Sequence, residues 1–252
     1  MMNICDFNFS DTVKLVNAFS FSIFGRVLFD YADLEKDALP ICMHFLLSEA
    51  ISKFCLDADN AVINAKARDI ISKIPELKRI LRTDAESIFL HDPAASSVSE
   101  VIMCYPGFYA IFCHRVAHEI YNSGFPILAR FICEHAHSLT GIDIHPGAKI
   151  GEGFSIDHGT GIVIGETAVI GRNVKIYQGV TIGAKSFPKN SDGSFRRDIK
   201  RHPTVMDGCI IYACATILGA DTVIGEGSVI GANVRITSSV APGTVVYYEK
   251  KG

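Results

Sequence analysis

Hydrophobic positions in the second half of the chain recur at every sixth residue. Isoleucine holds this step, with one shift of two, at Ile144, Ile150, Ile156, Ile164, Ile170, Ile176 and Ile182. After an interruption the step resumes at Met206, Tyr212, Leu218, Ile224, Ile230 and Ile236. A helix repeats every 3.6 residues and a half-buried strand every two, so neither produces this spacing. The pattern predicts a solenoid built from short repeats.

Six residues can form one short strand and a corner, and three such units close a triangular coil whose strands pair in parallel. The aliphatic residue of each unit then points inward, and glycine suits the corners. Roughly thirteen hexapeptides predict a little over four coils. A prism filled with aliphatic side chains leaves no interior pocket, so a site must lie between neighbouring prisms or under a loop. We therefore expect a trimer to be part of the mechanism.

The repeat is interrupted between Gly183 and Val205 by a segment rich in polar and turn residues, AKSFPKNSDGSFRRDIKRHPT. Such a segment cannot continue the inward aliphatic rod and is typical of a functional surface loop. The sequence predicts an extruded loop over about residues 184–204.

Helical spacing replaces the step of six between about residues 10 and 140, for example over 41–56, 61–81 and 109–121. This pattern predicts six to eight helices. They would cover the first coil of the prism, whose open end would otherwise expose unpaired backbone groups.

Local signals predict several helix boundaries. Thr83 and Glu86 have the spacing of a capping box at a helix start. Asp92 followed by proline has the form of an N-cap. Gly124 and Gly141 follow helical stretches, as residues just beyond a helix end do.

Composition narrows the class of protein. The chain has 252 residues, 48% of them hydrophobic and 20% charged, and a net charge of −3. This is the profile of a globular protein of one or two domains without a broad basic surface, so we expect no nucleic-acid partner. The eight cysteines are scattered without a CxxC pair, which favours reduced thiols. With no signal-like N-terminus and no apolar stretch of spanning length, we expect a cytoplasmic protein that does not bind membranes.

One long motif identifies a family. Residues 150–183 read IGEGFSIDHGTGIVIGETAVIGRNVKIYQGVTIG, with DPAA at 92–95, Asp143 in GIDIHPGAKIG, and KRHPTV at 200–205. From about residue 85 to 245 the chain resembles the serine acetyltransferases of the hexapeptide-repeat superfamily. The resemblance implies an α+β fold with an N-terminal all-α helical domain (1–140), which in many members assembles trimers into hexamers. A left-handed parallel β-helix (141–252) with the extruded loop follows it.

His158 is the candidate catalytic base. Asp143 lies fifteen residues earlier, close to one eighteen-residue coil, so its carboxylate can approach the imidazole from an adjacent rung. An acceptor there would fix the tautomer and stabilise imidazolium. We expect His158 to deprotonate a substrate hydroxyl, with Asp143 as its partner.

The resemblance also implies the substrate groups. Asp92 and Asp157 match positions that hold the ammonium and hydroxyl end of L-serine, and Arg201 and His202 match those that face the carboxylate. Asp92 could instead only cap a helix, and Arg201 could be an ordinary loop charge. A site that uses both the helical part and the loop would require assembly across a subunit boundary.

Acetyl-CoA is the implied co-substrate, with no permanently bound cofactor and no metal. The positions that match its binding edge are Gly183, Ala184, Ala213 and Ala232, each of which could equally be an ordinary corner residue. Lys185, Lys189 and Lys200 could meet the phosphates.

Several alternatives stay open. The acceptor could be a sugar or homoserine, or the chain could be a noncatalytic scaffold. A γ-class carbonic anhydrase would need a zinc site, for which His145, His158 and His202 are the candidates. The family resemblance implies L-cysteine as a competitive inhibitor. The sequence ends at APGTVVYYEKKG, without the longer tail by which many relatives dock into cysteine synthase, so no stable complex with that enzyme is expected.

Overall fold

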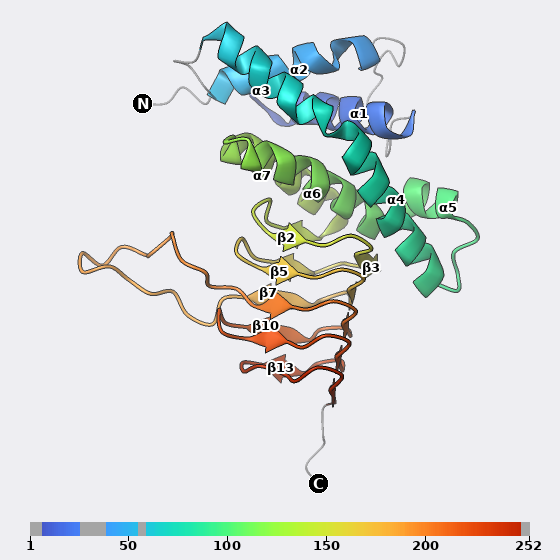
Figure 1. Cartoon of the computed structure of the whole chain (residues 1–252), viewed down its shortest axis with the longest axis vertical. Helices are drawn as coiled ribbons and strands as arrows, with labels where there is room; N and C mark the ends of the chain where they lie inside the picture. The colour runs from blue at the N-terminus through green and yellow to red at the C-terminus, as the bar shows by residue number, and fades with distance from the viewer. Residues whose placement is uncertain (1–6, 26–38, 55–58, 248–252) are drawn as a thin grey trace.

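The computed structural model describes residues 7–25, 39–54 and 59–247. Within them, seven helices come first: α1 (Phe9–Phe24), α2 (Leu39–Phe54), α3 (Asn60–Ser72), α4 (Ile74–His91), α5 (Val98–Cys104), α6 (Pro106–Asn122) and α7 (Pro126–Thr140). Fourteen short strands follow: β1 (Asp143–Ile144), β2 (Lys149–Ile150), β3 (Ser155–Asp157), β4 (Val163–Ile164), β5 (Val169–Ile170), β6 (Lys175–Tyr177), β7 (Thr181–Gly183), β8 (Thr204–Val205), β9 (Ile210–Ile211), β10 (Thr216–Leu218), β11 (Val223–Ile224), β12 (Val229–Ile230), β13 (Arg235–Ile236) and β14 (Val245–Val246). The helices stack above a column of coils (Figure 1).

Three parallel sheets form the sides of the column. Face A has the strand order β1-β4-β7-β10-β13, face B the order β11-β8-β5-β2, and face C the order β14-β12-β9-β6-β3. Up to β13, every third strand returns to the same face, so the column has close to five coils, where the sequence predicted a little over four. Ile144, Ile164 and Ile182 stack in register on face A and are at most 3% exposed. The predicted solenoid with inward isoleucines is confirmed.

For the first repeats after the arm, the sequence prediction of which residues face the core was wrong. Met206, Tyr212 and Leu218 point away from the core, and the residues just before them, Val205, Ile211 and Ile217, fill it instead. Because side chains alternate along a strand, a shift of one residue exchanges the inner and outer sides. The step from Ile217 to Ile224 is therefore seven residues, and the corner between them contains Gly219 at φ +108°. From Ile224 onward the predicted positions are correct.

Helices α4 and α6 dock on the first coil of the column through a buried ion pair. Arg115 of α6 contacts Asp84 of α4, with 3.0 Å between Nε and Oδ2. The guanidinium also donates to the backbone carbonyls of Ile150 and Gly151, and Asp84 accepts from the backbone N–H of Phe154 at 2.9 Å. Burial raises the pKa of the Asp84 carboxyl, against the opposing effect of Arg115. One charged pair thus joins two helices to the coil, which fixes the position of α4.

The helix predicted over 61–81 is two helices. α3 ends at Ser72 and α4 begins at Ile74, because Pro75 occupies the first turn of the new helix. Thr83 and Glu86 therefore lie inside α4 and form no capping box. Thr83 donates to the carbonyl of Ile80, and Glu86 pairs with Arg82.

Asp92 ends a helix rather than beginning one. It is the C-cap of α4, and its Oδ1 accepts from the backbone N–H of Ala94 at 2.8 Å. Asp commonly closes such a turn by bonding the backbone two residues on. The N-cap of α5 is Ser97. The predicted helix end at Gly141 is confirmed, with φ +69°.

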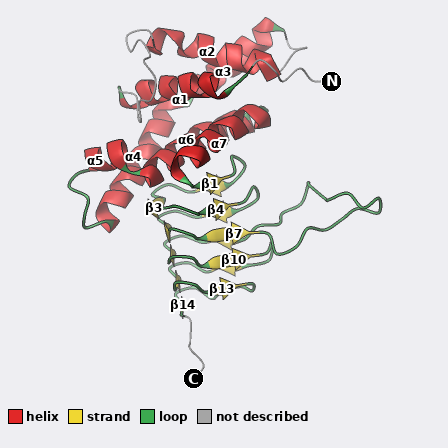
Figure 2. Cartoon of the chain, turned by 180° about the vertical axis from the view of Figure 1, so that it is seen from behind, coloured by secondary structure: helices red, strands yellow, loops and turns green. Residues whose placement is uncertain are grey.

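The segment between β7 and β8 projects from the column as a long arm, as predicted (Figures 1 and 2). Its outer part is a hairpin in which Lys189 and Phe195 form an antiparallel bridge. Among the described helices, none combines the length and apolar character that crossing a membrane requires.

Candidate active site

The candidate residues lie at two different corners of the coil. Asp157 and His158 stand at the end of β3, where the chain passes from face C to face A. Arg201 and His202 precede β8, where the chain passes from face A to face B. Within one chain, face A therefore separates the two groups.

A cleft between the end of α4 and strands β3 and β6 brings the two predicted aspartates together. Asp92, Tyr105, Asp157 and Lys175 are among the residues that line it. The Tyr105 hydroxyl donates to Asp92 Oδ2 at 2.6 Å. This bond, with the backbone bond from Ala94, holds the pKa of Asp92 below its usual value, and it raises the pKa of Tyr105 to about 12. Asp92 therefore caps its helix and also presents a charged carboxylate to the cleft.

Lys175 lies at the base of this cleft and is only 7% exposed. Its Nζ is 3.2 Å from Asp157 Oδ2, donates to the backbone carbonyl of His91 at 2.9 Å, and sits 4.6 Å from the ring centre of Tyr177. Burial acts to lower the pKa of this ammonium, but the contacts with Tyr177 and Asp157 outweigh it and raise the pKa. Lys175 is therefore a cation at neutral pH.

His158 directly follows Asp157, one of the residues that line this cleft. Its φ of +58° places the residue in the left-handed region, and its side chain is 76% exposed. Nε2 lies 3.5 Å from Asp157 Oδ1. An exposed imidazole beside two carboxylates can accept a proton from a hydroxyl bound between them.

Asp143 begins β1, in register with Val163 one coil below. Within the described residues, no hydrogen bond or ion pair joins it to His158. Its carboxylate instead faces His137 and Glu134 of α7, and the three candidate ligand atoms lie within 4.8 Å of one another. The role of Asp143 as partner of His158 stays a prediction.

The carbonic anhydrase alternative required three histidines around zinc. His145 Nδ1 accepts from the backbone of Gly147 at 3.0 Å, and His202 Nδ1 accepts from the backbone of Thr167 at 3.1 Å. These two nitrogens are already occupied by the protein. In the part of the chain that is described, the single cluster with metal-ligand spacing is the one at Asp143, and it includes none of the three histidines.

Arg201 is held at the base of the arm by a neighbouring acid. Its guanidinium pairs with Glu166, which also accepts from the Tyr121 hydroxyl at 3.0 Å. Burial favours the neutral acid, but the bonds from Arg201 and Tyr121 prevail and lower the pKa of Glu166. The backbone N–H of Arg201 donates to Thr167 Oγ1 at 2.9 Å. Arg201 is thus an ordered cation rather than a mobile loop charge.

His202 is neutral. It is 7% exposed, and burial together with the charge of Arg201 lowers its pKa to about 4. The backbone N–H of Thr167 donates to Nδ1, so the ring proton must sit on Nε2. His202 can therefore donate a hydrogen bond to a substrate oxygen, but it cannot supply a positive charge.

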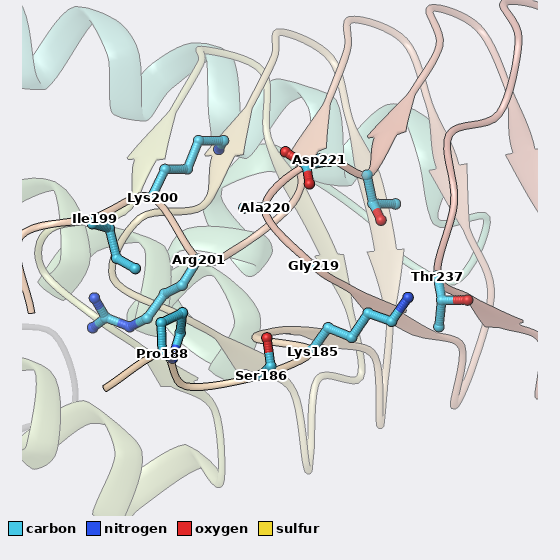
Figure 3. A pocket seen from close by; sticks show the side chains of 11 residues that line it. Lys185, Ser186, Pro188, Ile199, Lys200, Arg201, Gly219, Ala220, Asp221 and Thr237 are labelled. Carbon is cyan, nitrogen blue, oxygen red and sulfur yellow. The ribbon is translucent and has the colours of Figure 1, made fainter. Parts of the chain in front are cut away.

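The residues expected to contact acetyl-CoA also lie at two different corners of the column. Gly183 and Ala184 lie at the start of the arm, whereas Ala213 and Ala232 lie at the corners between faces C and A. A pocket beneath the arm is bordered by Lys185, Lys200 and Arg201 (Figure 3). Lys189 is farther out, over the ring of Phe195. Two of the three lysines suggested for phosphate binding therefore share one pocket.

Sequence reasoning missed four residues of these two groups. Tyr105, Lys175, Glu166 and Thr167 each hold or flank a predicted site residue. Lys175 occupies an outward strand position, where the repeat gives no reason to expect burial. Strand alternation alone could have placed it on the side of the sheet that also carries Asp157.

Comparisons with known proteins agree with the motifs. Residues 26–113 match the family profile described as serine acetyltransferase, N-terminal. Serine acetyltransferase of Bacillus subtilis is 48% identical over 162 residues, which cover 64% of this chain and 70% of the relative. The chain belongs to the serine acetyltransferase family.

Two further members of the family extend the comparison. The plasmid serine acetyltransferase of Synechococcus elongatus is 52% identical over 194 residues, or 75% of this chain, but the match spans only 60% of that relative's length. The crystal structure of Entamoeba histolytica serine acetyltransferase 1 in complex with L-cysteine superposes with a TM-score of 0.82. It is 35% identical, with 93% of this chain and 86% of that one covered. The helical part and the solenoid are thus shared with solved members of the serine acetyltransferase family.

Proposed function

We propose that the protein transfers the acetyl group of acetyl-CoA to the hydroxyl of L-serine, giving O-acetylserine and coenzyme A for cysteine biosynthesis. The observation that carries this proposal is the cleft in which Asp92 and Asp157 meet beside His158. Two carboxylates suit the ammonium of an amino acid, which a neutral sugar lacks. Family membership supports the same substrate.

The reaction needs a base and precise placement of two substrates. His158 accepts the serine hydroxyl proton while the oxygen attacks the thioester carbonyl. Collapse of the tetrahedral intermediate breaks the carbon–sulfur bond, and the imidazolium returns its proton to the departing thiolate. General-base catalysis contributes about 10²–10⁴-fold, and the rest must come from proximity and from stabilisation of the oxyanion.

The complete site would form between two chains of a trimer. The first chain supplies Asp92, Asp157 and His158, and the neighbouring chain supplies Arg201 and His202. Face A separates these groups within one chain, so packing of one prism corner against the next is the simplest way to join them. The same arrangement would bring Gly183 and Ala184 of one chain opposite Ala213 and Ala232 of another, along the bound coenzyme A. A dimer of such trimers, joined through the helices, is compatible with this site.

L-cysteine should compete with L-serine. It carries the same ammonium and carboxylate, and a thiol in place of the hydroxyl. The Entamoeba histolytica relative was crystallised with L-cysteine. We therefore expect L-cysteine to raise the apparent KM for serine.

The test is release of the coenzyme A thiol from acetyl-CoA with and without L-serine. The variant is His158→Asn, because asparagine tolerates the left-handed backbone of this position. We expect serine-dependent release and a fall in kcat of about 10²–10⁴-fold in the variant. Equal release with homoserine or an amino sugar would contradict serine as the acceptor. An unchanged rate in the variant would contradict the role of His158.

A further inference from the structure

The cleft contains a buried cation, Lys175. Binding the ammonium of an amino acid requires negative groups and does not by itself explain this lysine. Lys175 extends from the outer side of β6, where a lysine would ordinarily reach solvent, yet it is 7% exposed. The end of α4 covers it, and the backbone carbonyl of His91 accepts one of its hydrogen bonds. A buried lysine is stable only when its charge is compensated. Its partners therefore indicate its role.

The three N–H donors of the ammonium are accounted for within the protein. Nζ is 3.2 Å from Asp157 Oδ2, donates to the His91 carbonyl at 2.9 Å, and lies over the ring of Tyr177, 4.6 Å from its centre. Lys175 thus has no donor left for the carboxylate of a substrate. It acts on the substrate through the residues that it holds.

Both aspartates of the cleft depend on these contacts. The bond from Lys175 to Asp157 Oδ2 leaves Oδ1 directed to His158, at 3.5 Å from Nε2. The bond to His91 fixes the last residue of α4, and Asp92 is the next residue in the chain. Lys175 therefore positions Asp157 through its side chain and Asp92 through the backbone before it.

The net charge of the cleft also supports a positioning role for Lys175. Two unpaired carboxylates in one small cleft repel each other and attract any small cation. With Lys175 included, the cleft has one net negative charge, which matches the single positive charge of an amino-acid ammonium. The carboxylates can then stay close together and ionised before the substrate binds.

We propose that Lys175 is a positioning residue of the amino-acid site, and that its buried ammonium holds Asp157 and the end of α4 so that both aspartates face one substrate ammonium. This inference rests on the proposed acetyl transfer to serine. It predicts a defect in binding the amino acid, with binding of acetyl-CoA left intact.

The experiment compares steady-state kinetics of the full-length protein with those of Lys175→Met, which keeps the length of the side chain and removes its charge. We expect the KM for L-serine to rise by about tenfold or more, and inhibition by L-cysteine to weaken by a similar factor. The KM for acetyl-CoA should stay within about twofold. Lys78→Met is the matched control, because Lys78 is an exposed lysine of α4, and it should change none of these values.

Other kinetic results would overturn the role of Lys175 or the proposed function. A KM for serine that is unchanged or lower, or an equal loss of affinity for both substrates, would overturn the proposal. Lys175→Gln provides a second variant if Lys175→Met does not assemble, with the same expected rise. Loss of the folded assembly in both variants would make Lys175 a structural residue and also overturn the proposal. Absence of serine-dependent activity in the unmodified protein would instead refute the proposed function.

Discussion

At the scale of single residues, the chemistry of the cleft depends on hydrogen bonds that the motifs do not contain. Asp92 and Asp157 were expected from the family resemblance, whereas their partners Tyr105 and Lys175 were not. Tyr105 keeps Asp92 ionised, and Lys175 fixes one oxygen of Asp157. At the other corner, Glu166 and Thr167 hold Arg201 and His202 in the same manner.

Tyr105→Phe should weaken serine binding in a pH-dependent way. Loss of the hydroxyl lets the pKa of Asp92 rise toward its ordinary value, so the carboxylate is protonated at a higher pH as the solution is acidified. The KM for serine should increase about threefold to tenfold near neutral pH, and its rise on acidification should begin at a higher pH than in the unmodified protein.

The measurement is the KM for serine across the acid range, with Tyr247→Phe as a control at a tyrosine that is 67% exposed. Superimposable profiles for Tyr105→Phe and the unmodified protein would show that the hydroxyl does not control Asp92.

His202 should contribute to loss of stability in acid. Its pKa in the folded protein is about 4, below the ordinary value of about 6.5. A lowered pKa means that the unfolded chain binds the proton more readily, so the stabilisation is complete above about pH 6.5 and is lost as the pH falls toward about 4. His202→Asn keeps an acceptor for Thr167 without this titration. The drop in melting temperature between about pH 7 and about pH 5 should therefore be smaller in the variant. An equal drop would rule out this contribution.

At the scale of elements, the repeat could be predicted from the sequence because every coil must bury an aliphatic residue in the same axial column. The step of six survives the arm, since Ile182 and Ile217 still pair in register across it. The prediction failed at Met206, Tyr212 and Leu218, because one extra residue in the corner between Ile217 and Ile224 moves the register by one. Corner length depends on backbone geometry at Gly219, and hydrophobic spacing does not report it.

The helical boundaries show the same limit. Gly141 was predicted correctly because a left-handed residue after a helix strongly favours glycine. Thr83, Glu86 and Asp92 were interpreted from short motifs as helix starts, but Thr83 and Glu86 lie within α4 and Asp92 caps its end. Glu166 and Thr167 could not be predicted as partners of Arg201 and His202, because the arm separates them in the sequence.

Removal of the charge at Arg115 should loosen the docking of the helices. Arg115→Met leaves the buried Asp84 without its partner, and we expect a loss of about 3–5 kcal/mol in the free energy of unfolding. Combining it with Asp84→Leu removes the unpaired charge and should recover at least about 1 kcal/mol. Denaturant unfolding of the single and double variants measures both effects. A loss below about 1 kcal/mol in Arg115→Met would contradict the role of this pair.

At the scale of the whole molecule, the solenoid separates the two halves of the proposed site. Buried aliphatic side chains fill its interior, and its three faces put the cleft and the base of the arm at different corners. A single chain therefore presents Asp92, Asp157 and His158 without Arg201 and His202. Activity should depend on the contact between neighbouring chains.

Complementation between inactive variants tests whether activity depends on residues from two neighbouring chains. His158→Asn and Arg201→Ala proteins, each assembled like the unmodified protein and each severely impaired, are unfolded, mixed in equal amounts and reassembled. Half of the chains keep His158 and half of the neighbours keep Arg201, so about one quarter of the sites are intact. We expect recovery of about one quarter of the unmodified serine-dependent rate. Recovery no greater than that of the two variants reassembled separately would mean that both groups act within one chain, and would contradict the shared site.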